Sequence, residues 1–153
     1  MHKHARGQYV KLGIIAGLSF ASMYGMMFAM VDRFADVYSN VNQVYMAGLM
    51  TAPMVLIEML LMWAMLTDMR LNVLIIAASI MVMVGCFAAI RGQAGITDKQ
   101  LLRSMIAHHS STILMCRKAT IQDADIKEMC NRIIAGQRQE TDEMAAKLEE
   151  LSR

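Results

Sequence analysis

Three long apolar runs, at residues 12–31, 44–66 and 71–90, limit what this chain can fold into. A helix needs about 20 apolar residues to cross a bilayer core of about 30 Å, and each run reaches that length. The whole chain is 56% hydrophobic, which is too apolar for an ordinary soluble domain. We therefore expect a membrane domain of three spans over residues 12–91, preceded by a short basic tail over residues 1–11.

Two features of these runs bear on packing and chemistry. Small residues recur every four positions in the first run and would let another helix approach closely: Gly13, Gly17, Ala21, Gly25 and Ala29. The second run contains Glu58, and a carboxylate inside a span is costly unless it faces protein or water. One interpretation is a proton or metal relay with Met50, Met54 and Met62. The other is a protonated glutamic acid bonded to a neighbouring helix.

Basic residues near the spans predict the orientation of the chain. The tail contains Lys3, Arg6 and Lys11, and the turn at residues 67–70 contains Arg70, whereas the loop after the first run contains only Arg33. The positive-inside rule then places the N-terminus in the cytoplasm. Three spans carry the remainder of the chain across, so we expect the C-terminal part in the periplasm, attached to a bacterial inner membrane.

The C-terminal part reads as two helices after a linker at residues 92–96. Thr97 and Gln100 have the spacing of a capping box, so a helix should start there and reach about residue 119. Asp125 is a candidate cap for a second helix that reaches about residue 151. The predicted fold is all-α, with three transmembrane helices followed by an extramembrane antiparallel hairpin over residues 97–153. Two such helices cannot bury their own faces, so a homodimer of hairpins, or a higher homo-oligomer, is the simplest completion.

The first helix of this hairpin carries two adjacent histidines between methionines. At 100° per residue, Met105, His109 and Cys116 share a face, and His108 and Met115 lie at its edge. Imidazole and thioether together suit copper, and thioether favours Cu(I). In the alternative interpretation, the methionines fill the core and the histidines are solvated or hydrogen-bonded.

The second helix adds further candidates for a metal site: Gln137, Glu140 and Met144. Gln137 and Glu140 are polar groups in an apolar seam, and they are costly there unless they are paired or bind something. In an antiparallel register whose residue numbers sum to about 244, His109 faces residues 133–137 and Met105 faces residues 137–140. Glu140 then either holds the free ring nitrogen of His109 or ligates the metal itself.

The same register places Cys116 near Cys130. In an oxidising compartment the two could form a disulfide. The other interpretations, two buried thiols or two soft metal ligands, stay open at this point.

The spacing of these residues resembles a known family. It is carried by Met105, Ile106, His108, His109, Ile113 and Met115, followed by Ile133, Ile134, Gln137, Glu140 and Met144, over about residues 99–151. The chain here resembles the bacterial family called domain of unknown function 305, whose members are periplasmic, ferritin-like helical proteins linked to copper. The resemblance implies a four-helix bundle, of which one hairpin supplies half. The sequence departs from the family pattern at Ala107, where proline is usual, and has one His-His helix where many members have a doubled unit.

These observations predict a membrane-anchored protein that binds copper, as Cu(I) or Cu(II), for storage, tolerance or delivery. An enzyme is not expected, because no nucleophile has a convincing base beside it. A di-metal oxidoreductase would need Glu-x-x-His helices, and Met105 and Ile106 stand where those glutamates would be. A net charge of +2 without a basic stripe argues against a nucleic-acid partner. The alternative function is a structural or interaction module whose helices only mediate oligomerisation.

Overall fold

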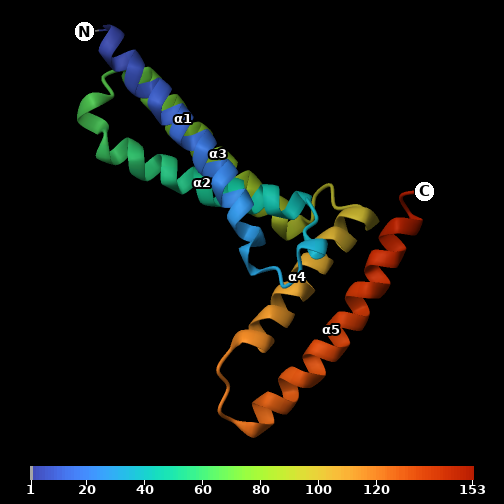
Figure 1. The fold of residues 1–153 in the computed structure, drawn as a ribbon. Helices are drawn as coiled ribbons and strands as arrows, with labels where there is room; N and C mark the ends of the chain where they lie inside the picture. Colours follow the sequence, from blue (N-terminus) through green and yellow to red (C-terminus); the bar gives the residue numbers. More distant parts are fainter. Residues whose placement is uncertain (1) are drawn as a thin grey trace. The chain divides into compact units, whose positions relative to one another are not determined.

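The computed structural model describes the backbone of residues 2–153 and the side chains of residues 7–153 (Figure 1). This part of the chain is all-helical and contains no strand, which confirms the predicted class. The α-helices are α1 (His2–Met26), α2 (Val41–Leu61), α3 (Met69–Gly92), α4 (Asp98–Lys118) and α5 (Ala124–Glu150). The short 3-10 helices are η1 (Met27–Met30), η2 (Phe34–Asp36) and η3 (Trp63–Met65).

The chain divides into two compact units. The span unit contains the residues up to 26 together with residues 42–94, and the hairpin unit contains residues 27–41 together with residues 95–153. The prediction placed residues 27–41 with the spans, whereas the structure groups them with the hairpin.

The span unit contains three helices long and apolar enough to cross a membrane, at Gly7–Met30, Val41–Leu61 and Met69–Gly92, which indicates membrane association. The expected tail over residues 1–11 is already helical from His2, because no helix-breaking sequence separates it from the apolar run; the side chains of residues 1–6 lie outside the described part. The second helix ends at Leu61, earlier than the predicted residue 66, because residues 63–65 form the 3-10 helix η3. Glu58 therefore lies in the last turn of α2 and not near the middle of a span.

A small apolar cluster and a polar turn hold the span unit together. The cluster contains Leu12, Val55, Met59 and Leu66 from α1, α2 and the turn after η3. Beside it, the Tyr9 hydroxyl lies 2.6 Å from Asn72 Oδ1, and Asn72 Nδ2 donates to the Leu66 carbonyl at 2.8 Å. At the start of α3, the Asp68 carboxylate accepts from the backbone amides of Arg70 and Leu71.

The row of small residues on α1 has no helix of this unit against it. A Cβ added at Gly13, Gly17 or Gly25 would meet nothing within 4 Å. The close approach occurs instead between α2 and α3, where a Cβ at Gly48 would lie 2.9 Å from Cys86 Sγ. The glycines of α1 therefore face outward from the three helices.

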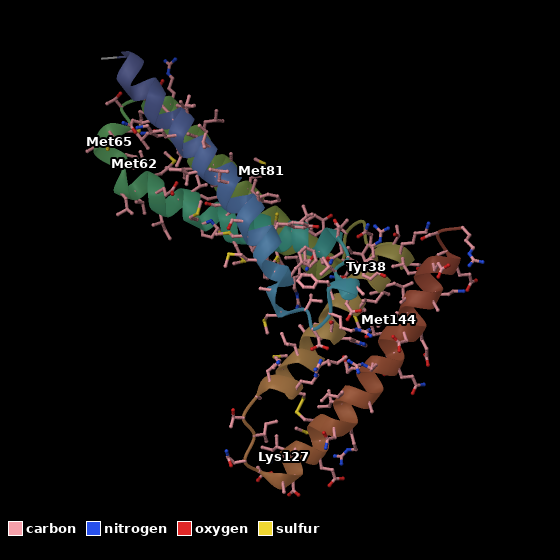
Figure 2. All side chains as sticks on the ribbon, in the orientation of Figure 1. Tyr38, Met62, Met65, Met81, Lys127 and Met144 are labelled. Atoms are coloured by element: carbon pink, nitrogen blue, oxygen red, sulfur yellow. A yellow bond between two sulfur atoms is a disulfide. The ribbon has the colours of Figure 1, made fainter. Side chains whose placement is uncertain are left out.

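In the hairpin unit, α4 and α5 run antiparallel, as predicted, and a disulfide joins Cys116 to Cys130 (Figure 2). Their Cα atoms are 5.3 Å apart, which is an ordinary separation for a disulfide. The bond sets the register so that facing residue numbers sum to about 246, two more than the predicted value. The two cysteines are bonded to each other, so neither is a thiolate ligand for a metal.

The helix caps differ from those that the sequence predicts. The Thr97 side chain makes no capping bond. The Gln100 side chain, which a capping box would place on the Thr97 backbone amide, accepts instead from the backbone amide of Val41 at 3.0 Å. The cap of α5 is Asp123, whose carboxylate accepts from the Ile126 amide at 3.0 Å, and not Asp125.

Residues 27–41 pack on α4 through η1 and η2. This segment follows the first apolar helix, and the hairpin follows the third. If each of the three helices crosses the membrane once, both segments lie on the same side. Their packing into one unit agrees with an even number of crossings between them, as spans at both α2 and α3 would give.

Reduction of the Cys116–Cys130 disulfide should destabilise the hairpin unit. Closure of a loop of this length is worth about 3 kcal/mol in the chain-entropy model. A Cys116→Ser/Cys130→Ser variant should therefore melt at a lower temperature than wild type when circular dichroism follows helix loss, and peptide mapping of unreduced wild type should recover the linked pair. Cys86→Ser is the matched control and should change neither result. Free thiols at both positions in the unreduced protein would contradict the pairing.

Candidate metal centre

The two histidines of α4 lie in different environments. His109 is 6% exposed, whereas His108 is exposed, and their ring centroids are 6.2 Å apart with the ring planes inclined by 57°. Consecutive helical residues point about 100° apart, so one imidazole enters the hairpin while the other faces outward. The structure therefore separates the two rings that the sequence places at one site.

The two methionines beside the histidines are not equivalent. Met105 and Met115 are 37% and 49% exposed. Met105 precedes His108 by three residues and His109 by four, so it is a helix-surface neighbour of both. Met115 lies seven residues beyond His108, about 10 Å along the helix axis. Within one chain, Met105 is therefore a neighbour of both histidines along the helix, and Met115 is not a neighbour of His108.

His109 faces a carboxylate from α5. Its Nδ1 lies 3.4 Å from Glu140 Oε2, close enough for an ion pair but without the alignment of a hydrogen bond. Burial lowers the pKa of His109, Glu140 opposes this effect, and His108 adds to it. The lowered pKa favours the neutral form of the ring, which is the form that binds metals.

Among the described residues, four buried polar atoms of the hairpin unit have no hydrogen-bond partner: Arg103 Nε, His109 Nδ1, Gln137 Oε1 and Thr141 Oγ1. The disulfide register places position 137 opposite position 109, and Thr141 is one turn further along α5. Buried polar atoms nearly always have a hydrogen-bond partner, so a ligand or water could bind to these unpaired atoms. Gln137 is predicted from the sequence, whereas nothing in the sequence indicates Thr141, which is 1% exposed.

Met144, the remaining predicted ligand of α5, lies one turn beyond Glu140 and is partly buried (Figure 2). Among the described residues, no group of three His, Cys, Asp or Glu side chains could hold a metal. A copper site in one chain would therefore need thioether or amide donors, such as Met105 and Gln137, beside His109 and Glu140.

A group of buried charges that the sequence does not predict lies next to these histidines. The Asp32 side chain is 3% exposed, and both of its oxygens accept from Arg117 Nη1 at 2.8 Å. Arg138 Nη2 lies 3.6 Å from the same carboxylate. Asp32 thus joins residues 27–41 to both helices of the hairpin. The sequence signal, an acid directly after an apolar run, does not identify the partner.

Ser110 connects this charge group to the histidines. Its hydroxyl is fully buried, accepts from the Asp32 amide at 3.0 Å and donates to Asp36 Oδ2 at 2.7 Å. Asp36 also accepts from Arg33 through both of its oxygens. Because Ser110 is adjacent to His109, these bonds fix the rotation of α4 that turns His109 inward.

The candidates inside the spans lie in the other unit. Met50 is 45% exposed, and Met54 packs against the cluster of Leu12, Val55, Met59 and Leu66. Glu58 is partly buried, and its Oε2 is buried without a hydrogen-bond partner among the described residues.

The depressed pKa of His109 predicts a pH dependence of stability. Below the ordinary histidine pKa of about 6.5, the unfolded chain binds a proton that the folded chain resists. Stability should therefore be complete above that pH and fall as the pH drops toward the pKa of folded His109. Melting temperatures measured between pH 7.5 and 5 should decline in wild type and decline less in His109→Gln. His108→Gln is the control, and an equal decline in wild type and His109→Gln would contradict the assignment.

Comparison with known proteins agrees with the resemblance seen in the sequence. The family model described as Domain of unknown function (DUF305) matches residues 57–148, so the match begins in α2 and includes α3 as well as the hairpin. The chain is 33% identical over 121 residues to "Uncharacterized protein L153" of Acanthamoeba polyphaga mimivirus, and the match covers 78% of each chain. No solved structure matches. The chain belongs to the family of domain of unknown function 305.

Proposed function

We propose that this chain is a membrane-anchored copper-binding protein that serves copper storage, tolerance or delivery. The observation that carries the proposal is His109, a buried imidazole whose Nδ1 has no hydrogen bond among the described residues and lies 3.4 Å from the Glu140 carboxylate. Exposed His108 and Met105 adjoin it on the outer surface of α4. Imidazole and thioether at one place favour copper over magnesium or calcium.

One chain supplies some of the ligands that a copper ion needs. His108 and Met105 would bind the ion at the surface, where the Met105 thioether favours Cu(I). His109 would bind it further in, with Glu140 either orienting the ring or adding an oxygen ligand. Gln137 Oε1, which is buried without a partner, is a further oxygen donor at that level.

A second copy of the chain would supply the rest of the bundle. Arg138 of α5 and Ser110 of α4 mark the side of the hairpin that residues 27–41 cover. Helical spacing places the opposite side along a row of apolar residues that are all 37–49% exposed: Leu101, Met105, Met115, Ile126 and Met129. We propose that two copies pair through this side to form a ferritin-like four-helix bundle, with Met105 and His108 of both copies near its seam.

The proposed location is a bacterial inner membrane, with the N-terminus in the cytoplasm and the hairpin unit in the periplasm. The disulfide supports this location, because such bonds persist in oxidising compartments. The joint packing of residues 27–41 with the hairpin supports a single side for both.

A structural or interaction module is the second candidate function. Its support is the outward-facing row of Gly13, Gly17 and Gly25, which leaves room for a helix of another chain. In that case the protein would oligomerise through its spans and would bind no copper.

Copper binding should depend on the histidines of α4. The chain contains four histidines, so His2→Ala/His4→Ala provides a background in which only His108 and His109 remain. Equilibrium dialysis of the full-length protein in detergent should show copper bound in this background. Adding His108→Ala should weaken binding, and adding both replacements should abolish it at the hairpin while helix content stays nearly unchanged.

Methionine variants provide the matched control for this measurement. Met105→Leu should weaken Cu(I) binding more than Cu(II) binding, because thioether is a soft ligand. Met115→Leu should have the smaller effect, since Met115 is too far from His108 to share its ion. Unchanged copper stoichiometry after loss of both histidines would contradict the site.

Reporter fusions test the proposed orientation. A reporter that is active only in the periplasm should work after Arg153 and within residues 31–40, and should fail within the turn at residues 67–70. The reverse pattern would place the hairpin unit in the cytoplasm. Activity at only one of the first two positions would contradict the packing of residues 27–41 with the hairpin.

A further inference from the structure

A pocket lies beside the Cys116–Cys130 disulfide, at the end of the hairpin where α4 turns into α5. Its volume is about 330 Å³, which is within the range of small-molecule sites, and both cysteines line it. Cys116 is partly exposed, whereas Cys130 is 8% exposed. A disulfide that only ties two helices together needs no access from solvent. This disulfide is instead accessible to a small molecule in the pocket.

The pocket contains a positive charge and no negative one. Lys127 lines it, and none of its lining residues is acidic. The Lys127 side chain is exposed and has no ion-pair partner among the described residues; Figure 2 labels it on α5, nearer the turn than the disulfide. Three uncharged polar residues also line the pocket: Thr120, Gln122 and Asn131. This lining favours a small anionic ligand that can form hydrogen bonds.

The two sulfurs are suited to different roles in thiol–disulfide exchange. In that reaction a thiolate attacks one sulfur, and the other sulfur leaves as a thiolate. Cys116 is the more exposed of the two, so its sulfur is the one to be attacked. Cys130 then leaves, and Lys127 precedes it by three residues on α5, which makes them neighbours on the helix surface. A neighbouring ammonium group stabilises the departing thiolate.

We propose that this pocket binds small thiols that carry a carboxylate, and that the Cys116–Cys130 disulfide exchanges with them. The carboxylate would interact with Lys127, while the thiolate of the same molecule attacks Cys116. This inference is independent of copper binding, and it adds a redox activity to the hairpin unit.

The exchange takes place in two steps, with the small thiol RSH as the reductant. In the first, RS⁻ attacks Cys116 Sγ, the bond between the two cysteine sulfurs breaks, and Cys130 leaves as a thiolate. In the second, another RS⁻ attacks the sulfur of the bound R group, and Cys116 leaves as a thiolate. Two RSH are thereby oxidised to RSSR, and two electrons and two protons convert the disulfide into two thiols. Reduction removes the covalent tie between α4 and α5, so the surrounding thiols would control the stability of the hairpin unit.

Three small thiols of different charge test the proposal: anionic mercaptopropionate, neutral mercaptoethanol and cationic cysteamine. Oxidised full-length Cys86→Ser protein in detergent would be mixed with each thiol, without oxygen and with a metal chelator present. Alkylation would stop the reaction, and mass spectrometry would follow reduction and locate the mixed disulfide. The rate should rise with thiol concentration, and the adduct should be found on Cys116.

Variants of Lys127 isolate the contribution of its charge, because each thiol is compared with itself. Lys127→Gln should slow all three thiols, since the departing thiolate loses its cation. It should slow mercaptopropionate by about threefold more than cysteamine, the scale of one exposed charge. Lys127→Arg should retain the wild-type ratio of the two rates. Lys118→Gln is the matched control, because Lys118 is exposed and close to the same turn but does not line the pocket.

Three results would overturn the proposal. A rate that does not depend on thiol concentration would mean that the hairpin has to open before the disulfide reacts. Equal effects of Lys127→Gln on all three thiols, or the same change of ratio in Lys118→Gln, would remove the preference for anionic thiols. An adduct on Cys130 would contradict the roles of the two sulfurs. Because copper is absent, none of these results depends on the proposed function.

Discussion

The buried carboxylate of Asp32 is the interaction on which the hairpin unit depends. A carboxylate that is 3% exposed is costly without partners, and here Arg117 and Arg138 supply them from two different helices. Both arginines remain about half exposed, so the net contribution is on the order of 1–3 kcal/mol, as for hydrogen bonds to charged groups. One side chain thereby connects the segment between the first two spans to the whole hairpin.

This connection has a chemical consequence for the histidines. Asp32 and Asp36 both bond Ser110, and Ser110 is the residue after His109. Fixing Ser110 against residues 27–41 turns His109 toward α5 and leaves His108 and Met105 outside. The proposed copper centre therefore has one buried imidazole, His109, and two exposed donors, His108 and Met105.

Local patterns in the sequence predict much of this architecture. Apolar runs give the three long helices, and the inward face of α5, with Cys130 near Cys116, gives the hairpin register to within two residues. Long-range polar contacts are where the prediction fails. The Gln100 side chain accepts from the Val41 amide and not from the Thr97 amide. Asp32 pairs with Arg117 and Arg138, although the chain contains many other cations. Such pairings depend on three-dimensional proximity, which helical periodicity does not encode.

In the candidate site, too, helical periodicity predicts some neighbours and fails for others. Periodicity identifies His109, Gln137 and Glu140 as neighbours, and the structure places Nδ1 of His109 beside the Glu140 carboxylate. Periodicity also places His108 and His109 at one site, but adjacent helical residues diverge, and the buried environment separates them. Thr141 gives no signal in the sequence because threonine is common on helices, and its importance arises only from complete burial.

Hydrogen exchange of the full-length protein in detergent tests the central claim most directly, namely that residues 27–41 belong to the hairpin unit through Asp32. Amides of this segment should be protected in wild type. In Asp32→Asn they should lose protection together with neighbouring amides of α4, while residues 42–94 keep theirs. Exchange of residues 27–41 at the rate of an unfolded peptide in wild type would contradict the account, as would unchanged protection in the variant.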